Sequence, residues 1–409
     1  MTLFPLPLTE LLGQQGSHFV YLLIGMAFGA TLETAGFGNS KKLAAQFYFK
    51  DLTVFKVMFT AIIVAMTLIF LSSAFGLLDY NLVWVPPTYL WPGIVGGLIM
   101  GVGFIVGGFC PGTSLVGAVT GKIDALFFVL GVLFGIFLFG ETVSSFAVFF
   151  ESSFMGRFTL PELFGVDYGV VVLGVLAMAL FCFWGAEKIE AAIGGESAQK
   201  APRLAVPGAA FLVALGVITL LAGQPTNADR WNMIEAEQSV LLEQRAVQIE
   251  PAELLGLAHD TLIRAVMIDV RDERHYNLFH IHDARLVPMD RLVETAEQLM
   301  QEPPNTVFVV MSNDEARATE AWKVLKAESL PNVYILEGGV NNWIRTYGEE
   351  AFLRDRYVMN RADDTPAYRF ELAIGSRHPA AEPGPHGEVE FEPKVKLEQK
   401  RAPTSGGCG

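Results

Sequence analysis

Six long apolar runs in the first 223 residues constrain this chain more than any other feature. Each is long enough to cross the hydrocarbon core of a bilayer as a helix, which needs about 20 predominantly apolar residues. The runs cover residues 17–36, 52–78, 91–107, 123–148, 168–186 and 205–223. The sequence therefore predicts a polytopic α-helical domain at 1–223, surrounded by a lipid bilayer.

Basic residues between the runs predict how this domain is oriented. They gather in alternate loops: Lys41, Lys42, Lys50 and Lys56 after the first run, Lys122 after the third, and Lys188, Lys200 and Arg203 after the fifth. The intervening loops, 79–90 and 149–167, carry only Arg157. Because cytoplasmic loops are rich in Lys and Arg, we place the lysine-bearing loops in the cytoplasm. In the inner membrane of a bacterium, six crossings would then make the second half of the chain periplasmic.

The second half has the composition of a soluble acidic domain. Residues 224–409 hold 20 of the 29 Lys and Arg residues and 31 of the 43 Asp and Glu residues, a net charge of −11. This excess of acid argues against nucleic acid as a partner. We divide this half into a linker at 224–248, a folded domain at 249–350, and an extension with a flexible arm at 351–409. No cofactor and no metal ion are expected.

The membrane half contains an internal repeat. Shifting Gly25–Gly38 by 72 positions places it on Gly97–Cys110, and both segments are glycine-spaced helices that reach a Gly-Phe pair. A polar stretch, a short segment and a long apolar helix follow in each. Paired helix breaks at membrane depth are typical of transport sites. We expect broken or re-entrant helices around a conduction path; the alternative is a glycine-rich packing seam without a pore.

Cys110 is the candidate reactive group of the second break. Because Pro111 and Gly112 follow it, the thiol should lie at the N-terminus of a short half-helix, where the dipole and free N–H groups favour a thiolate and attract anions. Thr113 and Ser114 could add hydroxyl donors. A sulfur-bearing anion would suit this site. The alternative is that Cys110 is a small buried hydrophobe.

Glu33 and Cys182 are further candidates within the apolar runs. Glu33 lies one helical turn before the first break, and acids within membrane spans are functional by default. It would serve either as a proton acceptor or as a structural hydrogen-bonding group. Cys182 lies between two phenylalanines in an unbroken apolar helix, so we expect it to be a packing residue.

The stretch Gly107–Thr113, Gly-Gly-Phe-Cys-Pro-Gly-Thr, and the repeat around it resemble the YeeE/YedE family of membrane proteins, which take up thiosulfate and related sulfur compounds. The resemblance covers about 17–222. It implies a path in which cysteines at the repeated bends pass the substrate along through sulfur contacts. Only Cys110 matches such a position, because Gly38 stands at the other bend. The residues that we assign to the path are Glu33, Gly38, Gly108, Phe109, Cys110, Pro111, Gly112, Thr113 and Ser114.

Residues 249–350 alternate strand-like and helix-like stretches. Val266–Val270, Thr306–Met311 and Val333–Leu336 are short buried-strand runs, and Ala316–Ala327 has a helical pattern, so we predict a small α/β domain with a parallel sheet. The details resemble a rhodanese domain. The matching motifs are Ile268-Asp269-Val270-Arg271, His280-Ile281, Pro288, and Leu336-Glu337-Gly338-Gly339 with Trp343.

One position departs from the rhodanese pattern. The resemblance places the sulfur-carrying cysteine at Ser312 and the arginine of its loop at Arg317. A serine hydroxyl cannot form a persulfide, and Asp314 and Glu315 put two acids into the same loop. We therefore expect a docking or regulatory module rather than a sulfurtransferase. The alternative is that Ser312 and Arg317 still cradle a sulfur anion delivered from elsewhere.

The end of the chain resembles a sulfur-carrier arm. Glu388–Lys400 alternates charged and apolar residues, as a segment laid on a sheet edge or a partner would. Gly406-Gly407-Cys408-Gly409 resembles the arm of the SoxY carriers, whose cysteine holds sulfur intermediates covalently in the periplasm. We assign Cys408 as a sulfur carrier, and a sulfur-carrier protein is a further candidate partner.

These observations favour an importer of thiosulfate or another sulfane-sulfur species, which is not itself an enzyme. Cys408 would handle sulfur at the pore mouth, reaching a groove near Ser312. Two alternatives remain open. The first is a membrane sensor of sulfur compounds that signals through the rhodanese-like domain. The second is a membrane-anchored sulfurtransferase in which Cys408 replaces the thiol absent at Ser312.

Overall fold

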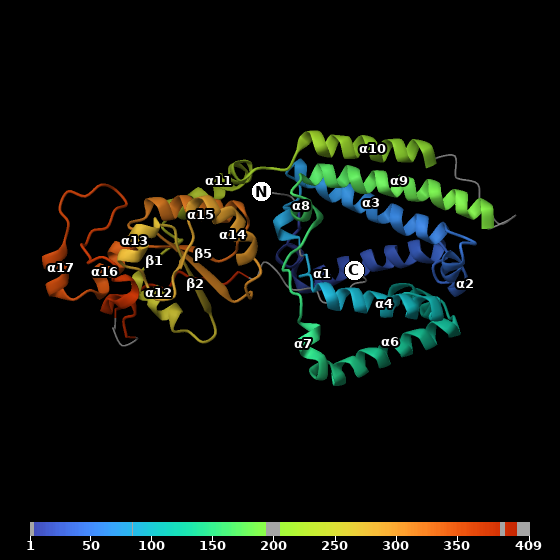
Figure 1. Ribbon diagram of the computed structural model, residues 1–409, viewed down its shortest axis with the longest axis horizontal. Coiled ribbons are helices and arrows are strands. Elements are labelled where there is room, and N and C mark those ends of the chain that lie inside the picture. Colours follow the sequence, from blue (N-terminus) through green and yellow to red (C-terminus); the bar gives the residue numbers. More distant parts are fainter. Residues whose placement is uncertain (1–3, 84, 194–204, 385–388, 399–409) are drawn as a thin grey trace. The chain divides into compact units, whose positions relative to one another are not determined.

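The computed structural model describes residues 4–83, 85–193, 205–384 and 389–398. The chain forms two units, which are described separately (Figure 1). A helical unit comprises Leu3–Tyr80 and Val85–Gln224, and an α/β unit comprises Pro225–Pro403.

Long apolar helices build the helical unit (Figure 1). Together with shorter helices, in chain order they are α1 (Leu8–Thr34), α2 (Ser40–Ala45), α3 (Thr53–Ala74), α4 (Leu90–Gly107), α5 (Pro111–Val119), α6 (Ile123–Thr142), α7 (Ala147–Phe150), α8 (Leu160–Phe164), α9 (Tyr168–Ile193) and α10 (Ala205–Ala222). Helices α3, α9 and α10 pack against one another, and α5 packs against α6.

Four stretches of the described chain are long and apolar enough to cross a membrane. They are Thr53–Ala74, Leu90–Val119, Ile123–Phe150 and Tyr168–Ile193. Helix α10 qualifies only together with α11 (Asn227–Glu243), which would make five. Only 6–28% of each apolar window is buried inside the protein, so most of this surface faces outward, as in lipid-facing helices. The protein is therefore a multi-pass membrane protein.

The sequence predicted six crossings, and the described part of the chain supports four or five. The difference at the N-terminus lies in α1, which covers the first predicted run. Its apolar stretch is short, because Gln14, Gln15 and His18 precede it and Glu33 follows it. The even number of crossings, from which the periplasmic placement was predicted, therefore no longer follows from helix length and composition.

The predicted internal repeat is confirmed in the helical unit. Helices α1, α2 and α3 follow the same plan as α4, α5 and α6: a long helix, a break, a short helix and a second long helix. Each break begins at a glycine in the left-handed region, Gly36 with φ 78° and Gly108 with φ 72°. A side chain would be strained at either position. The 72-residue shift places these two glycines on each other.

A five-stranded parallel sheet of order β1-β5-β4-β2-β3 forms the core of the α/β unit. Its strands are β1 (Gln248–Ile249), β2 (Arg264–Asp269), β3 (Arg285–Leu286), β4 (Thr306–Met311) and β5 (Val333–Leu336). The predicted bounds of β4 and β5 are confirmed. Every residue of β4 is buried, because this central strand is covered on both faces, and its sequence is accordingly an almost continuous apolar run.

Helices cover both faces of the sheet (Figure 1). The helices that follow β1 in this unit are α12 (Pro251–Ala258), α13 (Glu273–Leu278), α14 (Leu292–Leu299), α15 (Ala316–Ala327), α16 (Gly339–Tyr347) and α17 (Glu350–Arg356). Of these, α12, α15 and α16 contact the strands. The predicted bounds of α15 are confirmed. Helix α11 packs on α15, with the ring centres of Trp231 and Trp322 6.2 Å apart. The segment 224–248, expected as a linker, thus contributes a helix to this unit.

The extension after residue 350 packs onto the same unit. Phe370 lies 5.1 Å and His378 lies 5.9 Å from Phe279, as measured between ring centres. Trp343 Nε1 donates to the carbonyl oxygen of Ala380 at 2.6 Å. The hydrophobic core therefore continues beyond the predicted boundary, through aromatic residues too irregularly spaced to produce a periodic pattern.

Residues 389–398 lie extended beside β5, held by side chains of the domain rather than by strand pairing. Their backbone N–H groups donate as follows: Lys394 and Val395 to Glu253 (2.8 Å each), Lys396 to the Tyr334 hydroxyl (2.8 Å), and Glu398 to Asn332 (2.7 Å). Asn332 directly precedes β5. The segment therefore runs toward the end of the sheet at which the parallel strands begin.

Candidate functional site

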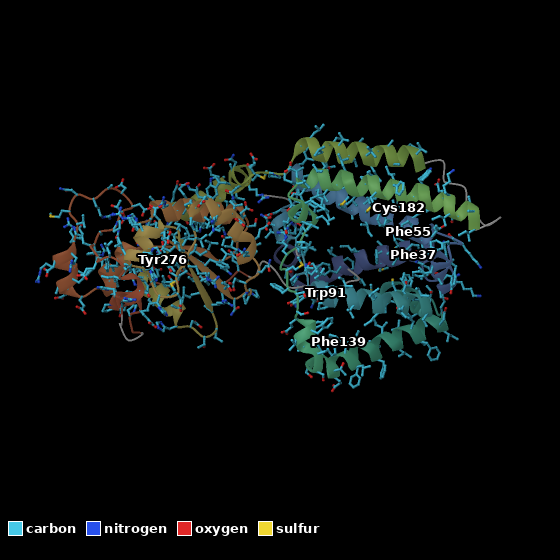
Figure 2. The ribbon with its side chains drawn as sticks, in the orientation of Figure 1. Phe37, Phe55, Trp91, Phe139, Cys182 and Tyr276 are labelled. Atoms are coloured by element: carbon cyan, nitrogen blue, oxygen red, sulfur yellow. The ribbon has the colours of Figure 1, made fainter. Side chains whose placement is uncertain are left out.

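The two helix breaks of the repeat pack directly against each other. Phe37 and Phe109, the aromatic residues of the two Gly-Phe pairs, are buried in one cluster, and Figure 2 labels Phe37. The other buried members of this cluster are Leu43, Val54 and Ala125. A side chain at Gly108 would meet the backbone oxygen of Ser40 at 3.1 Å. The breaks therefore form the packed centre of the repeat.

Cys110 caps the N-terminus of α5. Its sulfur accepts from the backbone N–H of Thr113 at 3.4 Å and lies 3.2 Å from the Thr113 hydroxyl, which in turn accepts from the Cys110 N–H at 3.0 Å. Pro111 is the first helical residue, where a missing N–H costs nothing. The thiol is partly exposed, whereas Ser114 is buried and its hydroxyl donates to the Pro111 carbonyl at 2.7 Å. The thiol thus lies at the helix N-terminus, as predicted. The Ser114 hydroxyl donates its hydrogen to a backbone carbonyl and not to the thiol.

An ion pair fills the corresponding place in the first repeat. Lys122 Nζ lies 3.3 Å from Glu33 Oε1. A Cβ atom on Gly38 would overlap the Glu33 carboxylate and lie 2.7 Å from Lys122 Nζ. The second carboxylate oxygen, Oε2, is buried without a hydrogen-bond partner among the described atoms. The absence of a side chain at Gly38 therefore leaves room for the ion pair. The place that the Cys110 side chain takes in the second repeat is taken in the first by the Glu33 carboxylate and the Lys122 ammonium group.

Two further polar contacts surround the breaks. The Ser40 hydroxyl donates to the Asp124 carboxylate at 2.7 Å, which joins α2 of the first repeat to α6 of the second. Lys42 Nζ donates to the carbonyl oxygen of Ala35 at 2.8 Å, one of the backbone groups left free where α1 ends. These contacts fix the short helices relative to the breaks.

In the α/β unit, the loop after β4 holds Ser312 in a fully buried position. Its hydroxyl donates to the carbonyl oxygen of Asp314 and accepts from the N–H of Ala318, both at 3.2 Å. The hydroxyl thus caps the first turn of α15 instead of facing solvent. Gly339, with φ 59°, lets the loop approach closely, since a Cβ there would meet the Ser312 carbonyl oxygen at 2.5 Å.

A carboxylate from the extension occupies the N–H groups of this loop. Asp364 accepts from the backbone N–H of Asp314 at 2.7 Å and from that of Arg317 at 3.0 Å. Arg361 binds the Asp314 carboxylate through two nitrogens, at 2.5 and 2.7 Å. Burial alone would raise the pKa of Asp314, but hydrogen bonds from Arg361 and Asn341 outweigh it and hold the pKa below its ordinary value.

Arginines support the loop from both sides. Arg271 is buried and binds Asp269 through Nε at 2.9 Å, while another nitrogen donates to the Asn313 side chain at 3.3 Å. The Arg317 side chain turns outward and pairs with Asp272 at 3.0 Å. The predicted pair of Ser312 and Arg317 is therefore not arranged as a cradle, because neither side chain faces the space that Asp364 occupies.

Comparison with known protein families accounts for both units. The model of a sulphur transport family matches residues 34–238, half of the chain. The chain belongs to the sulphur transport family. A rhodanese-like domain matches residues 250–346, so the fusion follows the order expected from the sequence. No curated protein and no solved structure matches the chain.

The sequence of this sulphur transport protein predicts where the two helix breaks lie, but it does not predict that Lys122 pairs with Glu33 beside the first break. It assigned Glu33, Gly38 and Cys110, and the structure brings Glu33 and Gly38 together. From the sequence, Lys122 contributes only to the predicted orientation of its loop. Its ion pair with Glu33 joins residues 89 positions apart. One sequence signal does point to Lys122 as a site residue. It lies in a short turn close to the second break and directly before an apolar run.

Of the other two cysteines of this sulphur transport protein, Cys182 lies within the described residues. Cys182 is on α9, labelled in Figure 2, and is partly exposed within the long apolar helix. Cys408 and the rest of the predicted arm lie outside the described residues. The last described residue before it is Glu398, beside Asn332.

Proposed function

We propose that this protein imports thiosulfate, or a related sulfane-sulfur anion, across the inner membrane of a bacterium. The observation that carries the proposal is the joined pair of helix breaks, which presents a thiol at one break and an ion pair at the other. A helix N-terminus and an ammonium group both favour an anion, and a thiol favours contact with sulfur. Family membership supports sulfur-compound transport in general.

In this proposal, Cys110 and Lys122 contact the substrate in turn. The N-terminus of α5 and the Thr113 hydroxyl hold the anion beside the Cys110 sulfur. Lys122 is kept in place by Glu33, whose carboxylate gives way to the entering anion. Because the Glu33 carboxylate has an oxygen without a hydrogen-bond partner among the described residues, it is also the group that would take a proton when Lys122 pairs with substrate.

Uptake of labelled thiosulfate by proteoliposomes tests the proposal. The Cys110→Ser variant should take up thiosulfate about tenfold more slowly or worse, a loss equivalent to about 1.4 kcal/mol. Cys182→Ser is the matched control and should transport normally. Wild-type protein without uptake would point to a sensor instead, and normal uptake by Cys110→Ser would contradict the role of the thiol.

We also propose that the rhodanese-like domain is not a sulfurtransferase. Ser312 is buried and its hydroxyl is committed to two backbone groups, which supports a structural role for it. Purified protein should therefore not convert thiosulfate and cyanide to thiocyanate above background. Turnover that disappears in Cys408→Ser would instead favour a sulfurtransferase in which the arm supplies the thiol.

Cys408 is proposed as a sulfur carrier that serves the mouth of the transporter from the periplasm. The groove near Ser312, through which it was expected to act, is filled by Asp364, so the arm would serve another acceptor. Cells that depend on thiosulfate for growth should grow more slowly with Cys408→Ser. Unchanged growth and uptake would remove the arm from the mechanism.

A further inference from the structure

The loop Ser312–Arg317 binds an anion that belongs to the same chain. Two backbone N–H groups converge on the Asp364 carboxylate: that of Asp314 in the loop and that of Arg317 in the first turn of α15. Asp364 comes from the extension, about fifty positions further along the chain. Backbone N–H groups at the start of a helix bind anions well, because the helix dipole adds to their hydrogen bonds.

We propose that Asp364 is an autoinhibitory plug, which keeps small oxyanions of sulfur out of this loop. The plug is a side chain on an anchored segment. Arg361 holds that segment through its two hydrogen bonds to Asp314, and the backbone N–H of Asp364 donates to Asp314 at 3.1 Å. The Asp364 side chain can therefore leave the loop while the segment stays attached.

The backbone shows that the segment is shaped to deliver this carboxylate. Asp364 has φ 52°, in the left-handed region that side-chain-bearing residues rarely adopt. Asn313 donates from its side-chain amide to the Asp364 carbonyl oxygen at 2.7 Å, so the conformation is also fixed from the loop side. A local strain retained by several specific hydrogen bonds is typical of a site with a function.

The charges of the loop are arranged so that one anion is needed. The carboxylate of Asp314 is paired with Arg361 and that of Glu315 with Arg245, each at 2.7 Å, and Arg245 also pairs with Glu337 at 3.2 Å. With both acids paired, the two N–H groups form an attractive site for one further negative group, and Asp364 supplies it. An oxyanion such as thiosulfate would compete for these N–H groups only with Arg361 in place, since Asp314 would otherwise repel it.

Titration of the full-length protein with thiosulfate, and separately with sulfate, tests the plug by calorimetry. Asp364→Ala should bind either oxyanion at least about tenfold more tightly than wild type at this loop, and Asp364→Asn should lie between them. Asp363→Ala, which removes an exposed neighbouring carboxylate, is the control and should match wild type. Binding of thiosulfate at the membrane site contributes the same heat in wild type and in each variant, so it cancels in the comparison.

A second variant separates the plug from its anchor. Arg361→Met should not gain oxyanion affinity, because it leaves Asp314 uncompensated beside the N–H groups. If Asp364→Ala and Asp364→Asn bind no more tightly than wild type, or if Arg361→Met gains as much as they do, the proposal is wrong. Thiosulfate uptake by proteoliposomes is measured independently, so failure of the plug leaves the transport proposal standing.

Discussion

At the scale of single residues, Gly38 shows how this chain differs from a two-thiol path. The repeat aligns Gly38 with Cys110, yet the space beside Gly38 is taken by the Glu33 carboxylate and the Lys122 ammonium group. Both groups are the ends of flexible side chains, so a new side chain would displace them at small cost. The glycine therefore preserves an ion pair rather than the packing of the helices.

We expect Gly38→Ala to separate Glu33 from Lys122 and to slow thiosulfate uptake several-fold. The stability of the protein should change by less than about 1 kcal/mol, because the pair is partly exposed and such pairs contribute little to folding. Uptake by proteoliposomes and a thermal melt measure the two effects. Gly29→Ala is the control, since a Cβ there meets nothing within 4 Å. Equal uptake by both variants would show that the ion pair is dispensable.

At the scale of elements, the contact between α16 and the loop after β4 determines the shape of that loop. Gly339 has φ 59°, and the backbone N–H of Val340 donates to the Ser312 carbonyl oxygen at 2.9 Å. The same contact continues with Asn341 N–H and the Asn313 carbonyl oxygen at 3.0 Å. The loop is thus held by backbone groups, which do not depend on whether residue 312 is a cysteine or a serine.

Gly339→Ala should destabilise the α/β unit by about 3 kcal/mol, because a left-handed backbone and a backbone clash are penalised together. Chemical denaturation of the solubilised protein, followed by tryptophan fluorescence, measures the loss. Gly256→Ala on α12 is the control, since its Cβ would make only an ordinary contact of 3.8 Å with Phe391. Similar denaturation curves for both variants would contradict this account of the loop.

The docking of the extension should weaken in mild acid. Burial lowers the pKa of His378 below its ordinary 6.5. Above pH 6.5 the imidazole is neutral whether docked or free; as the pH falls below 6.5, the free extension binds a proton that the docked form excludes. Exchange protection of residues 351–381, corrected for intrinsic rates, should therefore be lower at pH 5.5 than at pH 8. His378→Phe should reduce this difference; the remainder reflects His275, whose pKa burial and Arg271 also lower.

The sequence could predict the elements whose pattern is local. Strands β4 and β5 are continuous apolar runs and helix α15 has a helical pattern, all are bounded by loop residues, and their predicted bounds are confirmed. Strands β1 and β3 have two residues each, too few for a periodic pattern. The role of Asp364 and the partner of Lys122 could not be assigned, because each contact joins residues far apart in sequence. Long-range polar contacts need the fold to be known first.

At the scale of the whole molecule, the side of the membrane on which the α/β unit lies decides what the arm can do. The lysine-bearing loops predict a periplasmic location. The span count does not decide, because four spans and five spans place the α/β unit on opposite sides of the membrane. The protein offers a direct measurement, because it has only three cysteines. In a Cys110→Ser, Cys182→Ser background, Cys408 is the one thiol left to label.

We expect a membrane-impermeant maleimide to label Cys408 in intact cells of that background. Cells lysed before labelling give the maximum signal, and the further variant Cys408→Ser gives the blank. Protection of Cys408 until lysis would place the α/β unit in the cytoplasm. Sulfur carried by the arm would then be received from the transporter instead of being presented to it.

The attachment of Glu398 to Asn332 limits where a thiol at Cys408 can act. Cys408 is ten positions after Glu398, and that length of chain spans at most about 36 Å. The arm starts where β5 begins, while the loop of Ser312 lies beyond the other end of the sheet, a strand length of about 20 Å away. Averaged over the sphere that it can reach, one thiol corresponds to a millimolar concentration. An acceptor inside that radius would meet the Cys408 thiol without needing any affinity for it, and an acceptor outside it would never meet it.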